Sequence, residues 1–391
     1  MTAELPFVDD SQQNPDYVDR LRLTLTDWGG DEADRDADRS GQTATTFRPP
    51  PEDGPFRVLS LDGGGIRGAF GAAVLAELEA RIGGPLTERF DLIAGSSTGA
   101  ILGCAMAAGI PAADLVTFYR ENGGAIFHPR PPFQPRGWLR LFFPAAAAIM
   151  RRRTGSNFAD FFRARYCPHM LEASLRAGLG HMTMAELSQC RVVVPSVNLS
   201  AGRIHIFRTP HLCRTGGHYD SRFEVVDVLR AATAAPTYFP HMVMPDGDSY
   251  CDGGLWAISP AVLAITEAMM IMQGCREGDC PPMADLSRIR ILSIGTGQSS
   301  YSLSPPGGDA GLIYWSSRVA DVMSVSQVQG VRPPTDCLLG ERQETINFEL
   351  PDASWRLDRV DLIEDLIELG QQKVAERFDS IAADFLGEPV G

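Results

Sequence analysis

Lysine is almost absent from this sequence of 391 residues, in which Lys373 is the only one. A catalytic pair of serine and lysine would therefore have to use Lys373, which falls in a helical pattern near the end of the sequence. Neither of the glycine-rich segments contains Gly-Lys-Ser or Gly-Lys-Thr. This absence excludes a P-loop for nucleoside triphosphates, because that loop needs its lysine to contact the phosphates.

Metal-binding patterns are missing as well. The eight cysteines are scattered without a C-x-x-C pair, and no H-E-x-x-H or EF-hand pattern occurs. We therefore expect neither a metal nor another cofactor. The sequence opens with Glu4, Asp9 and Asp10 rather than with a basic stretch and an apolar run. From this we expect no signal peptide and a cytoplasmic protein with reduced thiols.

A membrane span is also not indicated. Residues 92–113 carry no charge and are long enough to cross a bilayer. The segment 95–99 reads Gly-Ser-Ser-Thr-Gly, however, and would break an apolar helix near its start. We interpret the run as a buried strand, a sharp turn and a buried helix.

Negative charge is abundant and unevenly distributed. The formal net charge is −14, and an acidic protein repels the nucleic-acid backbone, so we expect no general nucleic-acid binding. Residues 1–55 contain 13 acidic side chains against five arginines, together with a run of three prolines at 49–51. We expect these residues to form a loosely ordered N-terminal arm.

Strands and helices alternate beyond the arm, which indicates the α/β class. The pattern predicts a strand at 56–61, a helix at 69–81, a strand at 90–95 and a helix at about 98–109. Glycine turns separate them, as in a parallel sheet with crossover helices. Further elements are expected as strands at 191–198, 203–207 and 290–294, and as helices at 227–235 and 358–385.

The segment 95–99 has the pattern G-x-S-x-G with Ser97 at its centre. A nucleophile on a tight turn between strand and helix needs glycine on both sides, because a side chain there would clash. Such a turn exposes the Ser97 hydroxyl and places it at the positive end of the following helix. The position of the motif therefore predicts a catalytic serine.

A second glycine-rich motif, Asp-Gly-Gly-Gly-Ile-Arg-Gly, occupies residues 62–68. Its glycines also fit the G-x-G-x-x-G pattern of dinucleotide-binding proteins, which need an acidic residue at the end of the next strand. Here Asp91 stands at the start of that strand, which argues against a dinucleotide. Backbone N–H groups of such a loop can instead stabilise an oxyanion.

The base that activates Ser97 is best supplied by a carboxylate. In α/β-hydrolases the triad histidine follows the acid, and no histidine follows Asp252. Asp252 precedes Gly253 and Gly254, which permit close backbone approach. A triad with an earlier acid and one of the preceding histidines stays open as an alternative; the candidates are His205, His211, His218 and His241.

Together the three motifs resemble the patatin-like phospholipase family. That family combines a D-G-G-G-x-R-G loop, a G-x-S-x-G turn and a later D-G-G or D-G-A, and it uses a Ser-Asp dyad without histidine. All three occur here in that order, and segments 231–240 and 291–297 also look typical of the family. The resemblance covers about 56–300 and implies a three-layer catalytic domain with a central, mostly parallel sheet flanked by helices. Residues 301–391 are expected to form a helical extension packed on that domain.

The resemblance implies a role for each matching residue. Ser97 would be the nucleophile, Asp252 its base, and Gly63, Gly64 and Gly65 the oxyanion donors. The supporting motif residues are Asp62, Arg67, Gly68, Gly95, Gly99, Gly253 and Gly254, of which Arg67 would orient the glycine loop. One departure is Ser96, where the family often has threonine.

The implied reaction is hydrolysis of fatty-acyl esters of membrane phospholipids through an acyl-enzyme, as in a phospholipase A. Alternatives on the same site are an esterase or an acyltransferase, and a catalytically inactive binding protein is a third. The expected partner is the membrane surface, with the protein peripheral on its inner face. Residues 56–127 also resemble bacterial patatin-like effectors that cyclic nucleotides switch on in anti-phage defence, which makes a cyclic nucleotide a candidate activator.

Residues 122–159, the arginine-rich segment, contain six arginines and no acidic side chain. Aromatic residues and prolines are interleaved among them. This composition favours either an ordinary cationic surface or a lid or docking segment over the active-site mouth. In the second case the aromatics would enter a lipid interface and the arginines would meet anionic head groups.

Overall fold

The structure is a computed structural model. It describes residues 47–130, 148, 163–212, 219–274, 285–299, 302, 304, 311–315, 318–352 and 354–387. Most of the predicted N-terminal arm and most of the arginine-rich segment lie outside these residues, so the predictions for both are not tested. Pro129, in the described beginning of the arginine-rich segment, forms an antiparallel bridge with Tyr166.

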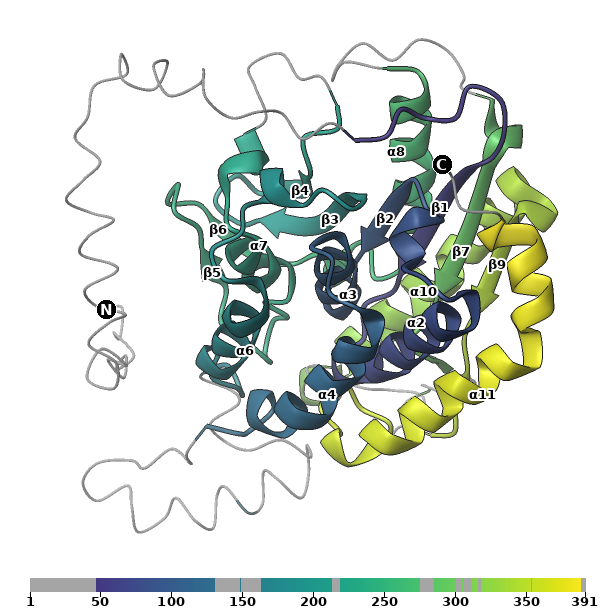
Figure 1. The fold of residues 1–391 in the computed structure, drawn as a ribbon. Helices are drawn as coiled ribbons and strands as arrows, with labels where there is room; N and C mark the ends of the chain where they lie inside the picture. Colours follow the sequence, from purple (N-terminus) through teal and green to yellow (C-terminus); the bar gives the residue numbers. More distant parts are fainter. Residues whose placement is uncertain are drawn as a thin grey trace, which may run out of the picture. The chain divides into compact units, whose positions relative to one another are not determined.

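A mixed sheet with mostly parallel strands forms the centre of the fold (Figure 1). Its order is β5-β6-β3-β2-β1-β7-β9, with β4 paired to β3. The strands are β1 (Phe56–Leu61), β2 (Leu92–Gly95), β3 (Arg191–Asn198), β4 (Arg203–Arg208), β5 (Met242–Val243), β6 (Ser249–Asp252), β7 (Ile289–Ile294) and β9 (Gln343–Ile346). Two short strands, β8 (Gln298–Ser299) and β10 (Glu349–Leu350), pair separately. The predicted strands at 56–61 and 191–198 are confirmed, while β2 is shorter than predicted.

Two strands share one edge of β3, and this arrangement decides where the site forms. β4 pairs with β3 along Val193–Asn198, so β2 and β6 must both lie on the opposite edge. β2 pairs in parallel with the start of β3, up to Val193. β6 pairs antiparallel with the end of β3, where Asp252 faces Ser196. The last residue of β6 is thereby placed just beyond the point where β2 ends.

Helices cover both faces of the sheet. Alternate side chains of β1 pack against the helices of opposite faces. Leu59 and Leu61 belong to a cluster with α2 (Gly68–Ile82), α4 (Ala112–Ile126) and α11 (Ile363–Ile381). Phe56 and Val58 point to the other face and pack against α8 (Ala261–Met272). Successive residues of a strand face opposite sides, so the run from 56 to 61 is buried almost throughout. The result is the predicted three-layer α/β fold.

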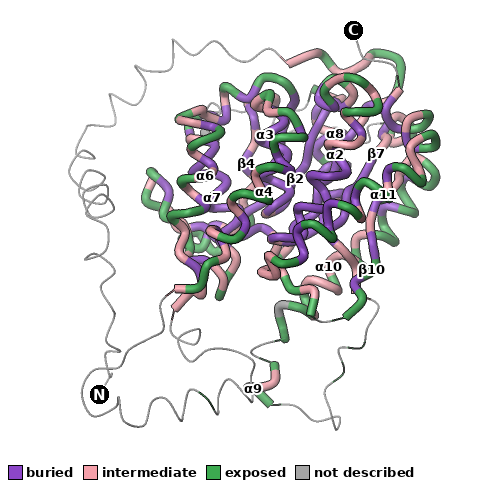
Figure 2. Tube along the Cα trace, turned by 60° about the horizontal axis from the view of Figure 1, so that its bottom comes forward, coloured by how far each residue is buried: buried purple, intermediate pink, exposed green. Residues whose placement is uncertain are grey.

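A further cluster lies over β3. It holds side chains of α3 (Thr98–Ala107), α6 (His169–Leu179) and α7 (Val225–Ala232). Figure 2 shows buried residues concentrated along the strands and α2, with exposed residues along the outer side of α11. No described helix is long and apolar enough to cross a membrane.

The C-terminal part contributes more than helices. α11 packs along α2 so closely that a Cβ at Gly370 would lie 2.7 Å from the Phe70 carbonyl oxygen. α9 (Leu312–Trp315) is short, and α10 (Val319–Leu339) packs near α8. β9 adds a parallel strand beside β7, which the predicted helical extension does not include. The domain limits at 55 and 300 stay a prediction.

Candidate active site

Ser97 occupies the turn between β2 and α3, as the G-x-S-x-G pattern predicts. Its backbone has φ 49° and ψ −117°, and it is one of two described non-glycine residues with positive φ. This conformation is unfavourable for a side chain and is held only where the surrounding structure enforces it. It lifts the hydroxyl away from the strand and toward the end of β6.

The flanking glycines are required by close backbone approach. A Cβ at Gly95 would lie 2.3 Å from the Gly99 carbonyl oxygen. A Cβ at Gly99 would lie 2.2 Å from the carbonyl oxygen of Leu61 on β1. Contacts below 3.0 Å to backbone atoms cannot be relieved by rotating a side chain, so both positions exclude alanine.

Asp252 ends β6 and directly contacts the serine. The Ser97 hydroxyl donates to Asp252 Oδ2 over 2.7 Å, and the Gly254 N–H donates to Oδ1 over 2.7 Å. The Asp252 side chain is buried, with the residue 4% exposed. Burial raises its pKa to about 6, while the bonds from Ser97 and Gly254 lower it. The carboxylate is therefore a stronger base than a solvated one, yet ionised at neutral pH.

Gly253 fixes how the chain leaves the carboxylate. A Cβ there would lie 2.1 Å from the Pro195 carbonyl oxygen of β3, so only glycine fits. Gly254 has looser surroundings, and its role is the N–H bond to Asp252.

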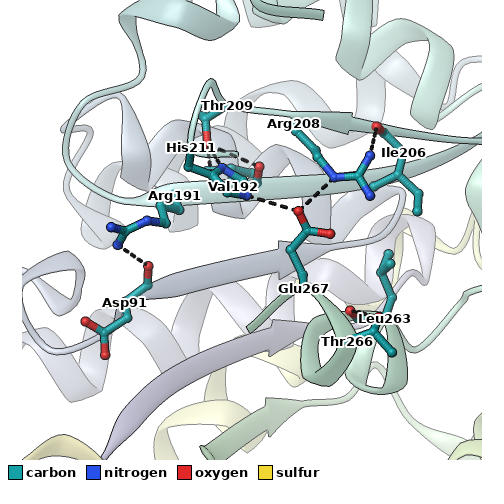
Figure 3. Close-up of polar contacts among 10 residues, drawn as sticks. All are labelled: Asp91, Arg191, Val192, Ile206, Arg208, Thr209, His211, Leu263, Thr266 and Glu267. Carbon is teal, nitrogen blue, oxygen red and sulfur yellow. Dashed lines mark hydrogen bonds and ion pairs between the residues drawn. The ribbon is translucent and has the colours of Figure 1, made fainter. Parts of the chain in front are cut away.

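The histidines that the sequence leaves open as bases have other partners. His205 bonds Asp220, and His211 bonds both Thr209 and the buried Glu267 (Figure 3). Arg208 completes the cluster by donating to Glu267. His241 is exposed, and His218 lies outside the described residues. Lys373 pairs with Glu376 on α11. The Ser97 hydroxyl thus donates to a carboxylate rather than to a histidine or a lysine.

The glycine loop lies against the serine, but one predicted donor is already engaged. A Cβ at Gly63 would be 3.2 Å from the Ser97 Cβ. The Gly63 N–H donates to the Ile258 carbonyl over 2.8 Å. The Gly63 N–H is therefore engaged within the fold in this structure, and the role of Gly63 as an oxyanion donor stays a prediction. The N–H groups of Gly64 and Gly65 have no acceptor among the described residues and stay as candidates.

Two residues missed by the sequence analysis hold this loop. Thr296, after β7, donates its hydroxyl to the Gly63 carbonyl over 2.6 Å, and its side chain fills the space beside Gly64. The carbonyl of Leu357 accepts from the Ile66 N–H over 2.9 Å. Leu357 also crowds Gly65, whose φ of +57° favours glycine. The segment 291–297 signals Thr296 through its family likeness, but nothing signals Leu357.

The remaining motif residues surround the loop. Asp62 is buried, and its Oδ1 has no partner among the described residues. Burial raises the pKa of Asp62 to about 7, although a hydrogen bond with Ser259 lowers it. Arg67 is buried at the end of the 3-10 helix η4 (Gly65–Arg67). A Cβ at Gly68 would clash with the hydroxyls of Thr98 and Tyr119. Among the described residues, no group of three or more His, Cys, Asp or Glu side chains could hold a metal ion.

Comparisons with known proteins give one family model and several relatives. Residues 59–265 match the family model described as patatin-like phospholipase. A cGAMP-activated phospholipase of Vibrio cholerae is 35% identical over 64% of this chain and 66% of its own length. One of Pseudomonas aeruginosa is 32% identical over 78% of this chain and 84% of its own. A third, of Escherichia coli, is 31% identical over 64% of both. The chain thus spans about two thirds of the length of the Vibrio and Escherichia proteins.

Proposed function

We propose that this chain, which belongs to the patatin-like phospholipase family, is a lipid acyl hydrolase that cleaves fatty-acyl esters of membrane phospholipids. Ser97 is the nucleophile and Asp252 its base. The observation that carries this proposal is the 2.7 Å hydrogen bond from the Ser97 hydroxyl to a buried carboxylate.

The chemistry follows from the atoms in place. Asp252 Oδ2 takes the proton as Ser97 Oγ attacks the ester carbonyl carbon. The carbonyl oxygen becomes an oxyanion, which the N–H groups of Gly64 and Gly65 stabilise. The intermediate collapses to an acyl-enzyme, and the proton on Asp252 passes to the departing lysophospholipid. Water, deprotonated by the same carboxylate, then releases the fatty acid and restores the Ser97 hydroxyl.

A cyclic nucleotide is the proposed activator, because the three relatives above are named for activation by cGAMP. We propose that the enzyme acts at the membrane surface on the cytoplasmic side, where such a ligand and the phospholipid are both present. The expected biological setting is defence against phage.

The test is fatty-acid release from vesicles of a defined phospholipid, with and without cGAMP. We expect release by the wild type, stimulation by cGAMP, and none by the Ser97→Ala variant. Hydrolysis confined to short soluble esters would replace the phospholipase proposal by an esterase, and acyl transfer to an added alcohol would indicate an acyltransferase. An absent response to cGAMP would remove the activator alone.

A further inference from the structure

The four residues Leu255–Ile258 connect the two halves of the catalytic apparatus. They follow Asp252-Gly253-Gly254 directly, and their turn is closed by bonds from the N–H groups of Trp256 and Ala257 to the Gly253 carbonyl. At the other end, the Ile258 carbonyl accepts the Gly63 N–H over 2.8 Å. A displacement of this segment would therefore move both the base and the glycine loop.

One side chain of α10, a helix that is distant in sequence, forms hydrogen bonds with both ends of this segment. Gln327 of α10 accepts the Ile258 N–H at its Oε1 over 3.1 Å. The same amide donates from Nε2 to the Leu255 carbonyl over 2.9 Å. An amide offers a donor and an acceptor on one planar group, and here both are used on one turn of chain.

We propose that Gln327 is a positioning residue of the active site, which holds the segment 255–258 so that Asp252 and the glycine loop keep their places around Ser97. This inference rests on the proposed function. Gln327 lies beyond residues 59–265, which match the family model, and it contacts neither Ser97 nor Asp252 among the contacts of the described residues.

The effect on chemistry has a definite route. Ile258 accepts from Gly63 at its carbonyl and donates to Gln327 at its N–H. These two groups lie in successive planar peptides that share the Ile258 Cα, so only the φ and ψ of one residue separate the bond to Gln327 from the bond to Gly63. Gly64 and Gly65 follow Gly63 in the chain, so this contact contributes, together with Thr296 and Leu357, to where their N–H groups point. Small displacements of these N–H groups would lower the rate of the reaction, because the donors must match the position of the oxyanion.

The test replaces Gln327 by methionine, which has similar length and no amide. The matched control is Gln329→Met, because Gln329 is exposed on the same helix. With a soluble ester substrate we expect Gln327→Met to lower kcat about tenfold or more with little change in KM. We also expect the acid limb of the kcat profile to move to lower pH, because a loosened segment admits water to Asp252. Gln329→Met should match the wild type in both.

A second measurement does not depend on activity. Hydrogen exchange at the amides of residues 255–258 and of Gly63 should accelerate about tenfold or more in Gln327→Met, with an unchanged midpoint of global unfolding. Faster exchange together with unchanged kcat and unchanged pH profile would overturn the proposal. Equal exchange in both proteins would overturn it as well. If the wild type itself hydrolyses no ester, the proposed function fails, and hydrogen exchange still decides whether Gln327 holds the segment.

Discussion

The Ser97 hydroxyl and the Asp252 carboxylate lie 2.7 Å apart, although 155 positions separate them in the chain. The pairing of the strands brings the two residues together, because β2 and β6 occupy successive stretches of the same edge of β3. β2, which leads into Ser97, pairs with β3 up to Val193. β6, which ends at Asp252, pairs with β3 from Ser196 onward. The dyad is thus built on regular structure rather than on long loops.

Ser97→Ala should reduce ester hydrolysis at least about a thousandfold, because the acyl-enzyme cannot form. The fold should be unchanged, since alanine meets the same backbone strain as serine at φ 49°. Fatty-acid release and the unfolding midpoint of the variant measure the two effects. Turnover above about a hundredth of the wild-type value would be inconsistent with a nucleophilic Ser97.

Asp252→Asn should be almost as damaging, because a dyad acts as a unit. Asparagine still accepts the Gly254 N–H but cannot take a proton from Ser97. His205→Ala serves as the control, since His205 bonds Asp220. The dyad would be wrong if the histidine variant lost activity and the asparagine variant kept it, as measured by kcat/KM.

The activity should have an acid limb near pH 6. Burial raises the pKa of Asp252 to about 6, and only the ionised carboxylate accepts the proton. As pH falls through that value, kcat/KM should fall, approaching about tenfold per pH unit. A profile recorded from pH 4.5 to 8 checks this, and a limb near pH 4 would mean that Asp252 is solvated in the working enzyme.

Asp62→Asn should stabilise the folded protein at alkaline pH. Burial raises the pKa of Asp62 to about 7 in the folded state, so the folded protein binds this proton more tightly than the unfolded chain does. Stability is therefore lost as pH rises from about 4 to above 7, by about 4 kcal/mol. Urea unfolding should favour the variant at pH 8 and show no difference at pH 4. Equal stability at pH 8 would contradict the burial of a charge at this site.

Gly99→Ala should destabilise the protein by about 3 kcal/mol or more, or prevent folding, because its Cβ would meet the Leu61 carbonyl at 2.2 Å. Gly124→Ala is the control within α4, where a Cβ has no neighbour within 4 Å. It should be neutral or slightly stabilising, because alanine favours a helix over glycine. Thermal unfolding of both variants gives the comparison.

The sequence predicts those parts of the site whose geometry restricts residue type locally. Gly95, Gly99 and Gly253 are such positions, because close backbone approach excludes any side chain. The bond from the Gly63 N–H to the Ile258 carbonyl could not be predicted, because only the folded chain brings these two groups together. Leu357 acts through a backbone carbonyl, which any residue could supply, so its identity carries no signal.

The fold, like the site, has parts that local sequence predicts and parts that only tertiary contacts decide. The apolar run at 56–61 and the alternation after it predict the parallel core, because both faces of β1 are buried. The helical extension predicted for 301–391 includes α10, but its bounds could not be predicted, because Pro333 and Pro334 normally end a helix. The strand β9 is only partly buried, with the pattern Gln-Glu-Thr-Ile, and its pairing with β7 decides its structure.

The bond from the Ile66 N–H to the Leu357 carbonyl has a consequence for biosynthesis. The nucleophile and the base leave the ribosome early, but the glycine loop gains this anchor only when residues around 357 have been made. A nascent chain would therefore carry Ser97 and Asp252 without a fixed oxyanion site. The oxyanion site would in this way stay incomplete until the segment around Leu357 has been synthesised.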